Sequence, residues 1–349
     1  MERQTQQSGA GGLVDRFGRR VSYLRLSVTD RCNFRCVYCM PEEGVALRPS
    51  RELLSYEEIE RVVGALAACG VERVRVTGGE PLVRKELPRL IARLNAIPGI
   101  REVVMTTNGT LLRRDAAALR EAGLRSVTVS VDSLNAARFA QITRGGDLGR
   151  VLDGIDAAEE AGLSVRINTV VVRGVNDDEL LELAGRALRR RWLLRFIEFM
   201  PIGAETIWSD LPRGGCVPAA EIRAVLGARW RLRELGMTTG AGPARYLNLD
   251  GPDVPSGDGP GVRHVGIISA VTECFCSACN RIRLTPQGGL RACLADDRET
   301  SLRDLMRGGA SDQELRAAVR RALGAKEETH DFDIDGAQVT RKQMVSIGG

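Results

Sequence analysis

Three closely spaced cysteines, Cys32, Cys36 and Cys39, restrict what this chain can fold into more than any other feature. They follow an alternating apolar and polar run that is typical of a strand. Three thiols so close together cannot all form disulfides, and three thiolates are one ligand short of a closed tetrahedral zinc site. They suit an iron–sulfur cluster in which cysteines hold three irons and the fourth iron stays open. A structural zinc site is the alternative, but the sequence supplies no further Cys or His within reach of this loop.

The spacing and setting of this loop resemble those of the radical S-adenosylmethionine (SAM) enzymes. In that superfamily the methionine end of SAM chelates the open iron of a [4Fe–4S] cluster, and the aromatic residue before the last cysteine packs near the adenine. The segment Thr-Gly-Gly-Glu-Pro at residues 77–81 is similar to one that contacts the amino end of SAM. Without the resemblance, this segment also fits a tight turn between a strand and a helix. The SAM contacts that the resemblance implies are Tyr38, Gly78, Gly79, Glu80, Ser130 and Met200.

Composition narrows the class of protein. The 349 residues are 43% hydrophobic and 27% charged, and the net charge of +5 is spread along the chain instead of gathered in a basic tail. This argues against a nucleic-acid partner and is compatible with an anionic substrate. The nine cysteines, the lack of a secretory signal and the lack of an apolar run of about 20 residues predict a cytoplasmic protein with no membrane segment.

Short β-branched runs alternate with helical patterns over the first 200 residues or so of the chain. Six strand–helix units predict parallel strands with right-handed crossovers, in either a partial barrel or an open, doubly wound sheet. In both folds the active site lies at the carboxyl ends of the strands. The superfamily resemblance favours a partial (βα)6 TIM-like barrel. The strands are expected at residues 21–28, 73–77, 103–107, 126–131, 165–172 and 194–199, with a capping box at Ser55 and Glu58 before the first helix.

The sequence predicts three parts. Residues 1–20 are expected to form a flexible leader, because they begin with a stretch rich in Gln, Gly and Ser. Residues 21–240 would form the barrel that carries the first cluster. Residues 241–349 would form a C-terminal α+β domain that covers the open side of the barrel.

A second cysteine group lies in this C-terminal part. Cys276 and Cys279 are followed by a turn at residues 286–289 and then by Cys293. Two antiparallel strands joined at that turn would bring Cys293 beside the other two cysteines. A zinc ribbon is the alternative here, because Cys274 could serve as a fourth ligand.

Together the two groups resemble the GTP 3′,8-cyclase family of molybdenum cofactor biosynthesis, from about residue 21 to the terminal Gly348 and Gly349. The resemblance implies a second [4Fe–4S] cluster on Cys276, Cys279 and Cys293, whose open iron meets the guanine of GTP. It implies a radical reaction that starts at C3′ of the ribose and closes a bond to C8 of guanine. It also implies that the terminal double glycine enters the active-site cavity, whereas the sequence alone would predict a frayed end.

The sequence has no glycine-rich loop of the Walker A type, so basic side chains must hold a triphosphate. The resemblance implies GTP contacts by Arg25, Arg75, Thr106, Arg166, Arg281, Ile282 and Arg283. Arg166 stands where the family often has a lysine, and Arg281 and Arg283 share one face of a strand. No residue is assigned as a general acid or base.

The resemblance further implies an electron donor and a companion cyclic pyranopterin synthase, with the chain a monomer or a homodimer. Two other functions are considered. A peptide-modifying radical SAM enzyme with an auxiliary cluster would generally carry more cysteines in its C-terminal half. A zinc-binding interaction protein would contain zinc instead of iron and sulfide.

Overall fold

The computed structural model describes residues 12–203, 215–236, 242–251, 253–257, 262–332, 340 and 342–348. Six parallel strands form the centre of the fold, as predicted. They are β1 (Tyr23–Ser27), β2 (Arg73–Thr77), β3 (Glu102–Thr107), β4 (Ser126–Ser130), β5 (Ser164–Val171) and β6 (Leu193–Glu198).

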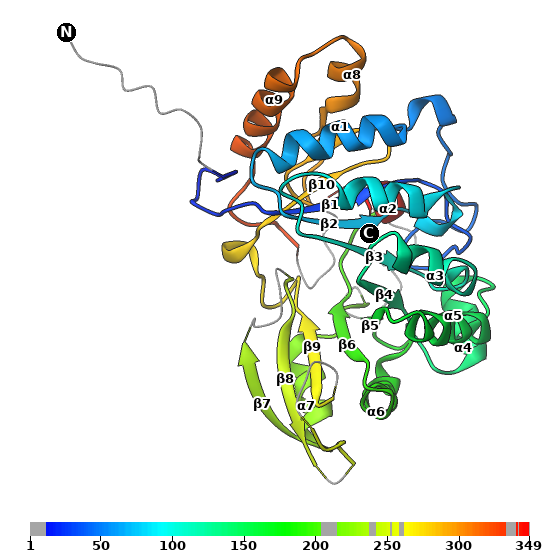
Figure 1. Ribbon diagram of the computed structural model, residues 1–349. Helices are drawn as coiled ribbons and strands as arrows, with labels where there is room; N and C mark the ends of the chain where they lie inside the picture. Colours follow the sequence, from blue (N-terminus) through cyan, green and yellow to red (C-terminus); the bar gives the residue numbers. More distant parts are fainter. Residues whose placement is uncertain are drawn as a thin grey trace.

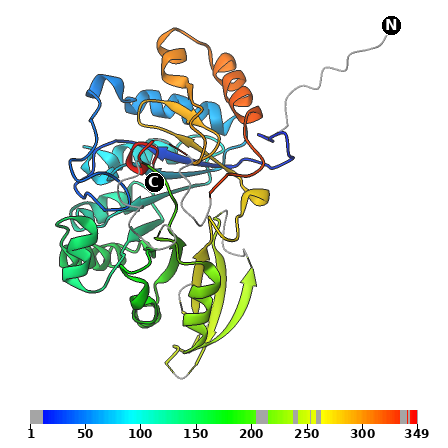
Figure 2. The same cartoon turned by 180° about the vertical axis from the view of Figure 1, so that it is seen from behind.

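Helices lie along the outer side of this curved sheet (Figure 1; Figure 2 shows the same arrangement from behind). They are α1 (Tyr56–Ala67), α2 (Leu87–Asn95), α3 (Leu112–Glu121), α4 (Ala136–Thr143), α5 (Leu148–Glu160) and α6 (Leu180–Arg190). The predicted capping box starts α1, since the Ser55 hydroxyl accepts from the Glu58 N–H and the Glu58 carboxylate accepts from the Ser55 N–H. Two helices, α4 and α5, follow β4 before the chain enters β5.

The C-terminal part extends both edges of the central sheet instead of forming a separate layer. β10 (Arg281–Leu284) pairs in parallel with β1, and β9 (His264–Ile268) pairs in parallel with β6. The remaining strands continue these edges in antiparallel fashion: β11 (Gly289–Arg291) and β12 (Thr300–Ser301) beyond β10, and β8 (Arg245–Asp250) and β7 (Arg231–Gly236) beyond β9. The described strands thus form one sheet in the order β12-β11-β10-β1-β2-β3-β4-β5-β6-β9-β8-β7.

Three further helices belong to this part. α7 (Ala219–Gly227) packs beside α6, and α8 (Leu302–Arg307) and α9 (Asp312–Gly324) pack beside α1. Figure 1 shows α8 and α9 above α1, so segments from opposite ends of the chain share one surface. No helix in the described ranges has the length and hydropathy needed to cross a bilayer.

The prediction of a flexible leader is wrong for residues 12–20. Leu13 is 1% exposed, Val14 pairs with Arg20 in an isolated bridge, and the buried Arg19 side chain hydrogen-bonds to the C-terminal part. These buried groups anchor the segment, which a polar composition could not reveal. Residues 1–11 and the predicted boundary near residue 240 lie outside the described residues.

Candidate active site

A cavity opens at the carboxyl ends of the parallel strands, where folds of this kind place their active sites. Its wall is built from β1 to β6, from the loop that carries the first cysteines, and from C-terminal segments around β10 and residues 344–345. The predicted site residues that line it are Arg25, Cys32, Cys36, Tyr38, Cys39, Arg75, Gly78, Gly79, Thr106, Ser130, Met200, Arg281 and Arg283.

The first cysteine loop packs directly on the double-glycine turn. The Gly79 N–H donates to the Thr29 carbonyl and the Glu80 N–H donates to the Arg31 carbonyl, each at 2.8 Å. A Cβ on Gly79 would lie 2.3 Å from the Arg31 carbonyl oxygen and 3.0 Å from Cβ of Cys32. Only glycine fits here, and the turn and the loop therefore form one continuous wall of the cavity.

The thiols of this loop are close to one another and are not in disulfides. Burial, and then the neighbouring Cys32, raises the pKa of Cys39 to about 12. Burial and then Cys39 raise the pKa of Cys36 well above its usual range. Buried thiolates are unfavourable without a compensating cation, so this donor set fits a metal cluster. In the described part of the chain no three Cys, His, Asp or Glu side chains are grouped closely enough to hold a metal ion.

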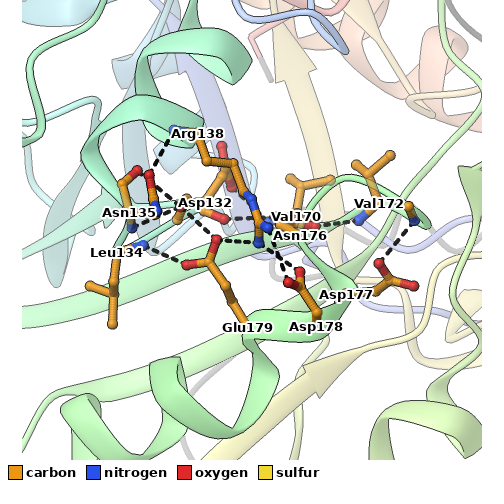
Figure 3. A network of polar contacts seen from close by, with 12 residues as sticks. Asp132, Leu134, Asn135, Arg138, Val170, Val172, Asn176, Asp177, Asp178 and Glu179 are labelled. Atoms are coloured by element: carbon orange, nitrogen blue, oxygen red, sulfur yellow. Dashed lines mark hydrogen bonds and ion pairs between the residues drawn. The ribbon is translucent and has the colours of Figure 1, made fainter.

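Tyr38 is fixed to the barrel by the buried carboxylate of Asp132, and Figure 3 shows the polar network around Asp132. Its hydroxyl donates to Asp132 Oδ2 at 2.5 Å, and the Val170 N–H donates to Asp132 Oδ1 at 2.8 Å. The Asn176 amide donates to the Asp132 carbonyl at 2.7 Å, which links this pair to the wider network around Glu179. Burial raises the pKa of Asp132 to about 6. Asp132 thereby ties the cluster loop to the ends of β4 and β5.

Arginines dominate the inner face of the barrel. Arg283, Arg25 and Arg75 are aligned by strand register across β10, β1 and β2. Arg75 donates to the hydroxyls of Thr106 and Thr128, both at 3.0 Å, rather than to carboxylates. Burial, and then repulsion from Arg75, lowers the pKa of Arg25 to about 9. Cations gathered this closely repel one another, so this wall favours a bound polyanion.

The second cysteine group lies behind the opposite wall. β10 and β11 form the predicted hairpin, with Arg283 opposite Arg291. Burial raises the pKa of Cys276 to about 11, and the nearby thiols, Cys274 first, add to the rise. Burial also opposes ionisation of Cys279, but Arg281 and Lys326 outweigh it and lower the pKa of that thiol to about 7.

The cavity reaches this group through residues next to the cysteines. Phe275, Arg281 and Leu294 line the cavity, and each is one or two residues from a cysteine of the group. The first cysteine group therefore lines the cavity itself, whereas the second group lies just outside the lining, next to residues that do line it.

The C-terminal segment enters the mouth of the barrel. Met344 and Val345 line the cavity, and Arg283 Nη1 donates to the Gly348 carbonyl at 2.7 Å. Gly348 has a φ of +71°, and a Cβ there would lie 2.8 Å from the Thr77 hydroxyl. A glycine is therefore required where the tail meets the end of β2.

Two family models match this chain. Residues 26–187 match the radical SAM superfamily, and residues 192–332 match Molybdenum Cofactor Synthesis C, whose match begins just ahead of β6. GTP 3′,8-cyclase from Pelotomaculum thermopropionicum is 47% identical over 97% of this chain and 100% of its own length. The enzyme of the same name from Geobacter sulfurreducens is 44% identical over 97% of this chain and 99% of its own length. The chain belongs to the GTP 3′,8-cyclase family.

Solved structures agree with this fold. SuiB from Streptococcus suis, in its crystal structure bound to SAM, has a TM-score of 0.56 at 14% identity. The match covers 86% of this chain and 68% of SuiB. At this identity the likeness shows the fold alone, a radical SAM partial barrel with a C-terminal part.

Some residues that the family resemblance assigned to the GTP 3′,8-cyclase site lie away from the cavity. Arg166 is near the start of β5, where it lines a separate hollow with Ser164 and Leu193. Ile282 is 2% exposed and its side chain packs against Val319 beneath α9, so only its backbone faces the cavity side. Gly349 lies outside the described residues.

Glu80, one of the SAM contacts that the resemblance implies, lies behind the glycine turn. It is 1% exposed and does not line the cavity. Oε1 accepts from the Leu82 N–H at 3.0 Å and the Thr107 hydroxyl at 2.8 Å, and Oε2 accepts from the Asn108 N–H at 2.6 Å. Burial raises the pKa of Glu80 to about 7. The carboxylate braces the glycine turn from behind.

Sequence reasoning missed two polar residues of the cavity wall, Arg195 on β6 and Asn168 on β5. Arg195 Nη2 donates to the Thr128 hydroxyl at 3.0 Å. Arg195 Nε and Asn168 Oδ1 are buried and have no hydrogen-bond partner among the described residues. Burial and then repulsion from Arg75 lower the pKa of Arg195 to about 10. The available signal was a polar side chain on the inward face of an otherwise apolar strand.

Proposed function

We propose that this chain is a radical SAM GTP 3′,8-cyclase, which converts GTP to 3′,8-cyclo-7,8-dihydro-GTP in the first step of molybdenum cofactor biosynthesis. The observation that carries the proposal is a cavity lined by the first cysteine group, by chain neighbours of the second group and by a row of arginines. The similarity to GTP 3′,8-cyclases over 97% of the chain supports it.

Cys32, Cys36 and Cys39 would hold the first [4Fe–4S] cluster, and Cys276, Cys279 and Cys293 the second. When bound, the first cluster and SAM supply the one-electron chemistry that starts the reaction at C3′ of the ribose. The residues of the chain bind and orient the reactants and keep solvent away from them. SAM would lie against the first cysteine loop and contact Tyr38, Gly78, Gly79, Ser130 and Met200, while Glu80 holds the turn in shape from behind.

The arginine wall would hold the triphosphate. Arg25, Arg75 and Arg283 form one row across three strands, and Arg195 on β6 adds a guanidinium that shares the Thr128 hydroxyl with Arg75. Bidentate arginine–phosphate contacts replace the backbone cradle that the sequence lacks. The guanine would then point toward the second cysteine group, beside Arg281. Thr106 would position the Arg75 side chain. Arg166 would act on GTP from the amino-terminal end of the barrel strands, and Ile282 would contact GTP through its backbone.

We place this activity in the reducing cytoplasm, because all nine cysteines are free thiols. The reaction needs an external electron donor, and its product would pass to a companion cyclic pyranopterin synthase. We propose a monomer or a homodimer, with no nucleic-acid partner.

The test is an anaerobic reconstitution of the full chain with iron and sulfide. We expect about eight irons per chain for two four-iron clusters and, with SAM and dithionite, formation of 5′-deoxyadenosine that depends on GTP. Eight irons with no response to GTP, but with turnover of a peptide, would favour the peptide-modifying alternative. Zinc without acid-labile sulfide would overturn the proposal.

A further inference from the structure

Lys326 is a buried cation beside the second cysteine group. Only three of the 50 basic residues of the chain are lysines, and this one lies just after α9 and is 2% exposed. Its Nζ donates to the backbone carbonyl of Arg281 at 3.0 Å and to that of Ala292. Arg281 is two residues after Cys279, and Ala292 directly precedes Cys293. One ammonium group therefore joins both arms of the cysteine site.

Among the described residues no acid cancels the charge of Lys326. Both of its hydrogen-bond acceptors are neutral carbonyls, and among the described residues no carboxylate lies within ion-pair distance of Nζ. A buried ammonium without a counter-ion is costly unless an anionic group binds next to it. The cysteine group is the candidate for that anion, since the two carbonyls that hold Nζ belong to residues close to Cys279 and Cys293 in the chain.

Arg19 offers an informative contrast, because it contacts the same site with a compensated charge. It donates to the carbonyls of Cys276 at 2.8 Å and of Glu328 at 2.6 Å, and so holds the segment after α9 against the cysteine loop. Its guanidinium also pairs with Asp15 at 2.5 Å. The Arg19–Asp15 pair holds the cysteine loop in place without adding net charge. Lys326 holds both arms of the cysteine site in place and also adds a positive charge.

We propose that Lys326 provides a buried fixed positive charge at the second cluster, in addition to that of Arg281 beside Cys279, and thereby raises its reduction potential. This inference rests on the proposed function only in so far as Cys276, Cys279 and Cys293 hold a [4Fe–4S] cluster. One-electron reduction, by dithionite in the experiment below, adds a negative charge to the cluster. A cation held nearby in a medium of low dielectric constant stabilises that reduced form.

The second cluster is isolated for the test by replacing Cys32, Cys36 and Cys39 with Ala in the full chain. In this parent we compare Lys326→Gln, Lys326→Met and Lys326→Arg, first by iron and sulfide content and then by redox titration followed by electron paramagnetic resonance. Gln and Met should make reduction about tenfold less favourable, roughly 59 mV for one electron. The Lys326→Arg variant keeps the positive charge, so its cluster should have the same reduction potential as that of the parent.

Two control variants separate charge from geometry. Lys85→Gln removes an exposed lysine and should change neither iron content nor potential. Asp15→Asn combined with Arg19→Gln removes the neutral pair, and should lower the resistance of the cluster to a chelator without shifting its potential. If the Gln and Met variants take up no iron, uptake restored by Arg alone assigns the effect to charge.

The inference would be overturned if the Lys326→Gln and Lys326→Met variants retain iron and their clusters have the same reduction potential as that of the parent. So would variants that lose iron while the remaining clusters titrate at the parent potential, because Lys326 would then be a structural brace. Loss of iron uptake in the Arg variant as well would also make Lys326 a structural brace and overturn the inference. A parent that takes up no iron would overturn the second cluster of the proposed function and the inference with it.

Discussion

The guanidinium groups of Arg75, Arg195 and Arg283 hydrogen-bond to hydroxyls and carbonyls, which are neutral and leave the positive charge available to a ligand. Arg195 also has an unused hydrogen-bond donor, since its Nε has no partner among the described residues. We expect Arg195→Gln to weaken GTP binding about 10- to 100-fold, the effect of losing one charge-assisted contact. Anaerobic equilibrium dialysis with the reconstituted protein measures this. Arg189→Gln, at an exposed position on α6, is the control, and equal affinities in the two variants would exclude Arg195 from the site.

Gly79 is the residue on which the first cysteine loop depends most directly. Gly79→Ala places a Cβ 2.3 Å from the Arg31 carbonyl, and the loop must move to relieve the overlap. We expect about 1–3 kcal/mol of destabilisation, as for other overpacked sites, together with lower iron content at the first group. Gly64→Ala in α1 meets nothing within 4 Å and should be neutral or stabilise the metal-free chain. Iron retention equal in the two variants would contradict the close approach.

Glu80 should make stability depend on pH. Because burial raises its pKa from 4.5 to about 7, the folded chain binds the proton more tightly than the unfolded chain. This contribution is fully present below about pH 4.5 and is lost as the pH rises through about 7, up to about 3 kcal/mol. Urea unfolding of the metal-free chain at pH 5 and pH 8 measures it against Glu80→Gln, which should lack this component. The same pH slope in both proteins would show that Glu80 does not titrate in this range.

At the scale of elements, the sequence predicted those features of the fold that depend on residues close together in the chain. The six parallel strands, the α1 capping box and the β10–β11 hairpin follow from periodicity, capping residues and turn residues. The edge strand β7 was missed, because its alternating Arg, Leu and Glu residues resemble a solvated segment.

Long-range contacts account for the other differences. Arg19 is anchored 257 positions away at Cys276, and no local pattern predicts such a bond. The cysteine ligands and the glycine turn could be proposed from spacing. Arg195, Asp132 and Lys326 needed the fold, because their roles depend on which strands and loops become neighbours.

The C-terminal tail is an element whose docking depends on one glycine. Gly348→Ala combines an unfavourable φ of +71° with a Cβ 2.8 Å from the Thr77 hydroxyl, so the tail should leave the barrel mouth. We expect GTP turnover to fall at least about tenfold, the effect of losing roughly 1.4 kcal/mol of positioning, with iron content unchanged. Gly324→Ala, where nothing lies within 4 Å, is the matched control. Unchanged turnover would show that tail docking is dispensable.

At the scale of the whole molecule, the two family regions are halves of one sheet. β1 lies between β2 and β10, and β6 lies between β5 and β9, so both edges of the six-stranded barrel are completed by strands from beyond residue 260. The arginine row also crosses this junction, since Arg283 comes from β10 and Arg25 from β1. The barrel therefore has neither closed edges nor a complete cavity wall without the C-terminal part.

This arrangement predicts that the six-stranded barrel, which ends with β6, does not fold without the C-terminal part. A chain that ends at residue 203 keeps β1 to β6 but exposes the backbone N–H and C=O groups of β1 and β6 that pair with β10 and β9. Unpaired strand edges of this kind promote association between chains. It also leaves buried arginines such as Arg25 and Arg75 open to solvent on an unsupported face. We expect aggregation, or loss of the cooperative urea transition of the full chain, as measured by circular dichroism and size-exclusion chromatography. A chain that ends at residue 332 keeps every described strand and is the matched control. If the shorter chain were monomeric and unfolded as cooperatively as the longer one, the shared sheet would not be what holds the two regions together.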